Sequence, residues 1–194
     1  LKGSGNRLNM PLVNVKRLDI PDVMLFQFKV FEDDRGFFTE LWKRSEYLAT
    51  SLPYDFVQVN LSYSRPYVVR GLHYQLKPSE QGKLVYVVRG RVLDVAVDIR
   101  RGSPWFGKYV AVELTPGLAL WVPPGFAHGF QALEETYFLY LVTKEYDQQR
   151  ERCIRWNDPA LGIKWPAPEK AILSQKDRNC PPLTQAESNF EYPL

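Results

Sequence analysis

The chain has 194 residues and a mass of 22.5 kDa, a usual size for one domain with a single hydrophobic core. Its 25 Lys and Arg residues and 22 Asp and Glu residues give a net charge of +3, which is too small for the dense basic surface that nucleic-acid binding needs. The sequence shows no long apolar run and no signal peptide, so we expect a cytoplasmic protein without membrane contact in which Cys153 and Cys180 are reduced.

The predicted elements begin after a polar opening segment. Residues 1–9, LKGSGNRLN, have the composition of a flexible leader or a tag remnant, and we place a single domain over residues 10–194. The spacing of the strand-like segments within this domain is typical of an all-β sandwich or barrel. Eight segments rich in β-branched and aromatic residues predict strands, at residues 22–31, 56–64, 83–90, 91–100, 108–114, 118–123, 128–133 and 136–143.

The segment at 91–100 shows the clearest strand periodicity. Apolar residues at every second position alternate with a second set that contains Asp94 and Asp98, so one face should meet an apolar layer and the other should carry the acids. The sequence leaves open whether these two acids serve a site or form structural hydrogen bonds inside the barrel. Arg89 and Gly90 form a tight-turn signal, and we expect this turn to join 83–90 to 91–100 as a hairpin.

Helical patterns are rare in the chain. Only residues 39–50, TELWKRSEYLAT, carry a convincing one. Beyond residue 144 the chain becomes polar and rich in proline, which predicts a long segment of short helices and loops packed over the β core. These patterns together predict an all-β, barrel-like antiparallel fold with short peripheral helices.

One of the two histidines, His73, lies in the motif RGLHYQ at residues 70–75. Arg70, Gln75 and Lys83 lie close to it in the sequence, on segments that we expect to form two neighbouring strands. On a strand, residues 73 and 75 share one face. Polar groups on the inner wall of a barrel are costly unless a ligand or water satisfies them, so this cluster favours a binding site.

Three roles are open to His73. With His128 and a carboxylate it could form a metal site, although the chain has only these two histidines and no H-x-H pair. It could also be a buried structural histidine. Alternatively, neutral imidazole could take a proton from a carbon beside a carbonyl, with Lys83 stabilising the enolate oxygen and a tyrosine from 136–143 returning a proton to the opposite face.

A longer pattern surrounds these residues. Seven blocks stand in order between about residue 19 and about residue 180: DDRGFFTELW, VQVNLSYSRPYVVRGLHYQ, QGKLVYVVRGRVLDVAVDIRRGSPWFG, LWVPPGFAHGFQAL, YLVTKEY, RWNDPALGIKWP and LSQKD. In this order and spacing the blocks closely resemble the dTDP-4-dehydrorhamnose 3,5-epimerases. The resemblance implies a cupin-like double-stranded β-helix, or jelly roll, that works without a metal or cofactor.

The resemblance also implies a reaction and the residues that carry it out. The expected reaction is epimerisation at C3 and C5 of dTDP-4-dehydro-6-deoxyglucose to dTDP-4-dehydro-L-rhamnose, in which the C4 ketone acidifies both carbons. His73 matches the family's base and Asp177 the carboxylate that orients it. Lys83 matches the lysine that steadies the enolate. Tyr140 matches the proton donor on the opposite face.

A nucleotide-binding set follows from the same resemblance. It comprises cations for the diphosphate, aromatic rings near the thymine and polar residues that line the cleft. Family members are homodimers that exchange N-terminal strands, so some of these residues could serve the partner's site. The cations are Arg35, Arg70 and Lys176, and the aromatic residues are Phe38 and Tyr146. The polar residues of the cleft are Glu40, Gln58, Asn60 and His128.

Other activities remain open from the sequence. Close relatives invert only C3 or only C5 and keep the same histidine, lysine and tyrosine, and a ketoisomerase on a related 4-keto-6-deoxy sugar would share the fold. A sugar-nucleotide-binding cupin without catalysis would have no use for His73, Lys83, Tyr140 and Asp177 together. Departures from the family pattern, such as Trp105 where threonine is common, remove no proton-handling group.

Overall fold

The computed structural model describes residues 12–50, 52 and 55–194, so the expected leader at residues 1–9 lies outside the described residues. Two short helices, α1 (Arg44–Ala49) and α2 (Gln175–Arg178), accompany the strands, with single 3-10 turns at Pro168–Lys170 and Leu183–Gln185. The strands are β1 (Leu12–Arg17), β2 (Met24–Phe28), β3 (Phe31–Asp33), β4 (Gly36–Phe38), β5 (Gln58–Ser64), β6 (Val69–Gln75), β7 (Lys83–Arg89), β8 (Val92–Asp98), β9 (Tyr109–Leu114), β10 (Leu118–Val122), β11 (Phe126–Ala132), β12 (Thr136–Val142) and β13 (Glu151–Cys153).

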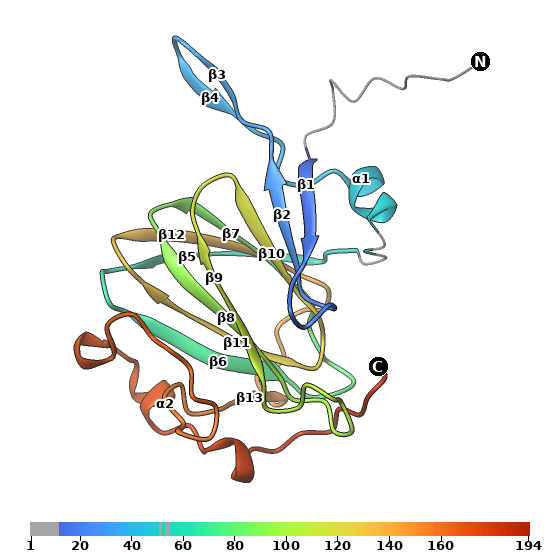
Figure 1. The fold of residues 1–194 in the computed structure, drawn as a ribbon, viewed down its shortest axis with the longest axis vertical. Helices are drawn as coiled ribbons and strands as arrows, with labels where there is room; N and C mark the ends of the chain where they lie inside the picture. Colours follow the sequence, from blue (N-terminus) through green and yellow to red (C-terminus); the bar gives the residue numbers. More distant parts are fainter. Residues whose placement is uncertain (1–11, 51, 53–54) are drawn as a thin grey trace.

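Two antiparallel sheets face each other and form the barrel (Figure 1). One sheet has the strand order β1-β2-β10-β7-β12-β5, and the other has the order β13-β6-β11-β8-β9. The third sheet is the hairpin β3-β4, which projects away from the barrel. All eight predicted strand segments contain strands, which confirms the all-β fold with short peripheral helices. Four strands, β1, β4, β6 and β13, fall outside those eight segments, and a fifth, β3, shares only Phe31 with them.

The predicted hairpin across Arg89 and Gly90 is wrong. β7 lies between β10 and β12 in one sheet, whereas β8 lies between β11 and β9 in the other. Gly90, with φ +100°, therefore turns the chain from one sheet to the facing one, and a side chain here would collide with the backbone of Glu135. β7 and β8 each lie in the middle of a sheet, and both strands are mainly buried.

The expected neighbouring placement of the strands that carry His73 and Lys83 is also wrong. β6 belongs to the five-stranded sheet and β7 to the six-stranded sheet, so the two side chains enter from facing sheets. This matters for the site, because facing sheets can place two groups on opposite sides of one ligand.

The core explains the alternation seen in β8. Val92 and Ala96, on the face shared with the two acids, pack between the sheets. The opposite face, which includes Val95 and Val97, packs against the C-terminal segment, which contributes residues such as Trp156. The predicted alternation is confirmed, and both faces are buried because residues beyond 144 cover the outer one, as the sequence predicts (Figure 1).

The helix expected over 39–50 is shorter than predicted, because only Arg44–Ala49 is helical. The backbone carbonyl of Leu41 accepts hydrogen bonds from the hydroxyls of Tyr47, at 2.9 Å, and Tyr86, at 2.6 Å. Trp42 packs against the Tyr47 ring, with centroids 4.3 Å apart. These tertiary contacts hold the residues before the helix in a non-helical conformation and override their helical periodicity.

The expectation of two reduced cysteines is wrong as well. Cys153, at the end of β13, forms a disulfide with Cys180, which follows α2. The two cysteines are 27 positions apart, a spacing that matches no recognisable disulfide motif. Only the fold of the C-terminal segment brings them together. Within the described residues, no helix has the length and apolar character needed to cross a membrane.

Candidate active site

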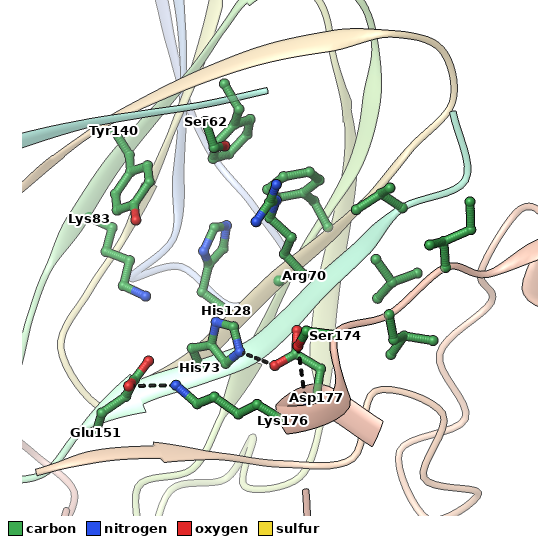
Figure 2. Close-up of a pocket in the computed structure, with 17 residues that line it drawn as sticks. Ser62, Arg70, His73, Lys83, His128, Tyr140, Glu151, Ser174, Lys176 and Asp177 are labelled. Atoms are coloured by element: carbon green, nitrogen blue, oxygen red, sulfur yellow. Dashed lines mark hydrogen bonds and ion pairs between the residues drawn. The ribbon is translucent and has the colours of Figure 1, made fainter. Parts of the chain in front are cut away.

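A cavity of about 510 Å³ opens between the two sheets, beside α2. His73 comes from β6, Lys83 from β7, Tyr140 from β12 and Asp177 from α2, so the structure brings all four predicted reaction residues to one cavity (Figure 2). Arg70, His128 and Lys176 of the predicted binding set line the same cavity.

His73 and Asp177 form a hydrogen-bonded pair on one side of the cavity. The Nε2 atom of His73 lies 2.6 Å from Oδ1 of Asp177. The other carboxylate oxygen, Oδ2, accepts a hydrogen bond of 3.2 Å from the backbone N–H of Gly71. Ser174 caps α2 by accepting a hydrogen bond of 3.1 Å from the Asp177 backbone N–H, which fixes the turn that carries the carboxylate.

The charge of Asp177 decides which nitrogen of His73 is free. Burial alone would raise the pKa of the Asp177 carboxyl, but the hydrogen bond and charge of His73, the Gly71 N–H and nearby Lys176 outweigh burial and lower it. An ionised carboxylate can only accept a hydrogen bond, so Nε2 of His73 carries the proton. In the neutral ring the other nitrogen, Nδ1, is then the one without a proton, and it points toward the cavity (Figure 2).

Glycine is required in the RGLH motif because two strands approach closely there. Gly71 has φ +129°, and a Cβ at this position would lie 2.8 Å from the carbonyl oxygen of His128. The register between β6 and β11 shifts at this point, between His128 and Phe130. The close approach places His73 and His128 opposite each other in the ladder and turns the Gly71 N–H toward Asp177.

Lys83 and Tyr140 face this pair from the other sheet. Burial lowers the pKa of Lys83 to about 8, against the opposing effect of Glu151 and Asp94, so the amine is still mostly cationic at pH 7. Burial raises the pKa of Tyr140, although the charge of Arg70 and a hydrogen bond with Asn60 oppose this. The site therefore offers a buried cation and a protonated phenol.

His128 forms a second histidine–carboxylate pair. Its Nε2 lies 2.8 and 2.9 Å from the two oxygens of Asp94, and both residues are buried. Burial raises the pKa of Asp94, against the opposing effect of His128 and Lys83. Asp98 behaves differently, because it bonds to Arg100 and to the Ser103 hydroxyl away from the cavity. Of the two acids on β8, it is Asp94 that bonds to a residue lining the cavity, His128.

Glu151 is a cavity residue that the sequence analysis missed. Its carboxylate pairs with Lys176 at 2.5 Å and accepts a hydrogen bond of 2.7 Å from the Tyr146 hydroxyl. Burial would raise the pKa of Glu151, but these partners and the charge of His73 lower it. Strand β13 has no clear periodicity in the sequence, so no local signal marked this residue. Ser62, on β5, also lines the cavity and was missed.

A second lobe of about 270 Å³ adjoins the cavity and shares His73, Lys83, Tyr140 and Glu151 with it. Three residues of the predicted binding set, Gln58, Asn60 and Tyr146, line this lobe. Gln58 donates a hydrogen bond of 2.8 Å to Asn60 and accepts one of 2.9 Å from the Tyr146 backbone N–H, so the three form one polar wall.

The structure does not bring Arg35, Phe38 or Glu40 to this cavity. Arg35 and Phe38 belong to the projecting hairpin β3-β4, and Glu40 follows it (Figure 1). The Arg35 side chain is 89% exposed and pairs with Asp33, and Phe38 is 64% exposed. Their expected role in a partner's site stays a prediction. Within the described part of the chain, no three His, Cys, Asp or Glu side chains gather as a group that could hold a metal ion.

Comparisons with known proteins agree on one family. The sequence model of the dTDP-4-dehydrorhamnose 3,5-epimerases matches residues 17–185. An epimerase of this name from Pseudomonas aeruginosa is 51% identical over 166 residues, which cover 84% of this chain and 91% of the relative.

Two solved structures extend the likeness to the fold. The crystal structure of the Sulfolobus tokodaii dTDP-4-dehydrorhamnose 3,5-epimerase is 47% identical, with a TM-score of 0.85 over 92% of this chain and 99% of that one. A dTDP-6-deoxy-D-glucose-3,5-epimerase from Legionella pneumophila, solved with dTDP-4-keto-L-rhamnose, is 41% identical, with a TM-score of 0.86 over 89% of this chain and 93% of that one.

Proposed function

The chain belongs to the dTDP-4-dehydrorhamnose 3,5-epimerase family, and we propose that His73, Lys83, Tyr140 and Asp177 carry out the epimerisation in the cavity between the two sheets. The activity is that of an isomerase, which converts dTDP-4-dehydro-6-deoxyglucose to dTDP-4-dehydro-L-rhamnose. One observation carries the proposal. The His73–Asp177 pair and Tyr140 enter a single cavity from opposite walls.

His73 acts as the base in the first step. Its Nδ1 takes the proton from C3 or C5, each of which is acidified by the C4 ketone. The positive charge that forms on the imidazole is stabilised by the Asp177 carboxylate at 2.6 Å. The pairing also holds the ring in the tautomer whose free nitrogen faces the substrate.

Lys83 stabilises the intermediate. Loss of the proton moves negative charge onto the C4 oxygen, and a preorganised cation in a buried site lowers the energy of that enolate. The buried position of Lys83 makes its ammonium group an effective stabiliser, because charges interact more strongly away from bulk water.

Tyr140 completes the inversion by supplying a proton from the other sheet. The carbon inverts only when the returning proton arrives on the face opposite to His73. The protonated phenol of Tyr140, half-buried at the wall of the cavity, suits this role.

The nucleotide part of the substrate has partners on both sides of the reaction residues. Arg70 and Lys176 supply cations for the diphosphate, and guanidinium groups suit phosphate oxygens well. Gln58, Asn60 and Tyr146 in the second lobe supply hydrogen bonds and a ring face for the base. The Legionella relative bound to dTDP-4-keto-L-rhamnose supports a ligand of this class.

The enzyme is proposed to be a homodimer in which the β3-β4 hairpin enters the partner's site. Edge strand β5 supports this arrangement, because it turns Val59, Leu61 and Tyr63 outward while its polar residues face the cavity. The hairpin would bring Arg35 and Phe38 to the partner's nucleotide. A cytoplasmic location rests on the family, although disulfides are unusual in reducing compartments.

The proposal is tested by incubating the protein with dTDP-4-dehydro-6-deoxyglucose in deuterated water, with a metal chelator present, and analysing the product by NMR. We expect deuterium at both C3 and C5 and the L-rhamno configuration. Exchange at one carbon alone would identify a mono-epimerase, and movement of the carbonyl would identify a ketoisomerase. Binding without any exchange would identify a non-catalytic sugar-nucleotide-binding protein.

A further inference from the structure

The disulfide lies directly beside the reaction residues. Cys153 is the register partner of His73 in the β13-β6 ladder, and Cys180 follows Asp177 within the same short segment. The bond therefore ties the strand next to His73 to the turn that carries its carboxylate partner.

An ion pair lies beside the disulfide and joins the same two segments of the chain. Glu151 lies on β13 with Cys153, and Lys176 lies on α2 before Cys180. The Glu151–Lys176 pair thus connects the same two segments as the disulfide (Figure 2). The ion pair depends on the charges of Glu151 and Lys176, whereas the disulfide is covalent and does not depend on charge.

Apart from its polar contacts, the turn that carries Asp177 has little buried apolar surface to hold it. α2 is a single turn of four residues, too short to be stable alone. Among residues 174–180, only Asp177 and Cys180 are buried. A buried carboxylate is stable only while its partners are in place, so Cys180 supplies the segment's one apolar anchor.

The flanks of this turn are held by the main chain. The carbonyl of Ile172 accepts a hydrogen bond of 2.9 Å from the N–H of Val69, and the carbonyl of Pro181 accepts one of 2.8 Å from the N–H of Arg155. Loss of the disulfide should therefore loosen residues 173–180 without releasing the rest of the C-terminal segment.

We propose that the Cys153–Cys180 disulfide is a positioning element that keeps the Asp177 carboxylate on His73, and that its reduction lowers turnover. This inference rests on the proposed role of His73 as the base. Reduction by dithiothreitol adds two electrons and two protons to the bond, which gives two cysteine thiols and oxidised dithiothreitol. The freed turn can then move Asp177 into water, which leaves His73 unaligned.

The effect has a signature that general destabilisation lacks. If the disulfide acts through Asp177, its reduction matters only while residue 177 can orient His73. In Asp177→Asn, which has already lost the carboxylate, reduction should change kcat less than about twofold. In the wild type, reduction should lower kcat about tenfold or more, because small misplacements of a base are costly.

The experiment measures kcat and KM in the oxidised and reduced states of the wild type and of Asp177→Asn. Thiol titration confirms each redox state, and hydrogen exchange follows residues 172–181. The double variant Cys153→Ser, Cys180→Ser controls for the reagent, because its kcat should be low and insensitive to dithiothreitol. We expect faster exchange in the reduced wild type confined to that segment, with the circular dichroism spectrum unchanged.

The outcomes separate this inference from the proposed function. Oxidised wild type that fails to turn over the substrate would overturn the proposed function itself. Active oxidised enzyme whose kcat is unchanged on reduction would overturn only the positioning role. Equal losses on reduction in the wild type and in Asp177→Asn, or loss together with global unfolding, would also overturn it, because the bond would then serve the whole fold.

Discussion

The carboxylate of Asp177 lies 2.6 Å from Nε2 of His73, although 104 positions separate the two residues in the chain. A one-turn helix brings the acid to the strand that carries the histidine, and the Gly71 N–H holds its second oxygen. The lowered pKa of Asp177 keeps the acid ionised, so the pair leaves one imidazole nitrogen free for the substrate.

Replacement of Asp177 tests the value of this pairing. Asp177→Asn preserves the size of the side chain but removes the charge that stabilises the imidazolium, so we expect kcat to fall by about 10²-fold or more with a smaller change in KM. Steady-state kinetics checks this. A variant that retains full kcat would show that His73 needs no orienting acid. Asp98→Asn would be unsuitable as a control, because Asp98 bonds to Arg100 and Ser103 and its loss would destabilise the fold.

Tyr140→Phe separates proton removal from inversion. Without the phenol, His73 can still exchange the proton on its own face, so we expect solvent deuterium to enter the substrate while inverted product decreases by about 10²-fold or more. NMR of the recovered sugar distinguishes the two. Tyr109→Phe, on a strand outside the cavity, should leave both rates unchanged. Equal loss of exchange and inversion in Tyr140→Phe would contradict the assigned role.

The pKa of Lys83 predicts the alkaline side of the pH profile. Burial favours the neutral amine and lowers the pKa to about 8, so the lysine is cationic below that pH and neutral above it. Since only the cation stabilises the enolate, kcat should fall as the pH rises through about 8. In Lys83→Met, kcat should be lower by about 10²-fold and this decline should disappear. An unchanged alkaline decline in the variant would assign it to another group.

The close approach at Gly71 predicts a large cost for any side chain there. Gly71→Ala should lower the free energy of unfolding by about 2 kcal/mol more than Gly102→Ala, because both have positive φ but a Cβ at Gly102 meets nothing within 4 Å. Thermal or urea unfolding measures the difference. Equal costs would mean that the β6-β11 approach is not as tight as the structure indicates.

The exposed face of β5 predicts the oligomeric state. Leu61 is 63% exposed on an edge strand, and a charge there should prevent pairing with a second copy. Light scattering should find a dimer for the wild type and a monomer for Leu61→Asp, whereas Leu48→Asp, at a leucine of α1 that is 47% exposed, should stay dimeric. A monomeric wild type would remove the basis for hairpin exchange.

Short-range patterns predicted the elements of the fold well, but not their partners. Alternation at 91–100 identified a strand, because side chains on opposite faces of a strand meet different surroundings. The Arg89–Gly90 turn predicts a hairpin because a tight turn reverses the chain. The same reversal also serves a chain that crosses to the facing sheet, and only the pairing of distant strands decides between the two. The same holds for the disulfide, whose cysteines meet through tertiary packing.

The candidate site shows the same division. The residue types around them are enough to predict roles for His73 and Lys83, whereas Asp177 and Tyr140 follow only from the family resemblance. Nothing local marks a carboxylate 104 positions from its partner. Neither the local pattern nor the family resemblance predicts a role for Glu151, which lies on a three-residue strand without periodicity. The structure was needed to place it between Lys176 and Tyr146.

The role of His73 as the base is tested most directly by His73→Asn. The rate of solvent deuterium incorporation at C3 and C5 of dTDP-4-dehydro-6-deoxyglucose should fall by at least about 10²-fold relative to the wild type, while calorimetry finds dTDP binding retained. Exchange at the wild-type rate in a variant that still binds dTDP would contradict this account.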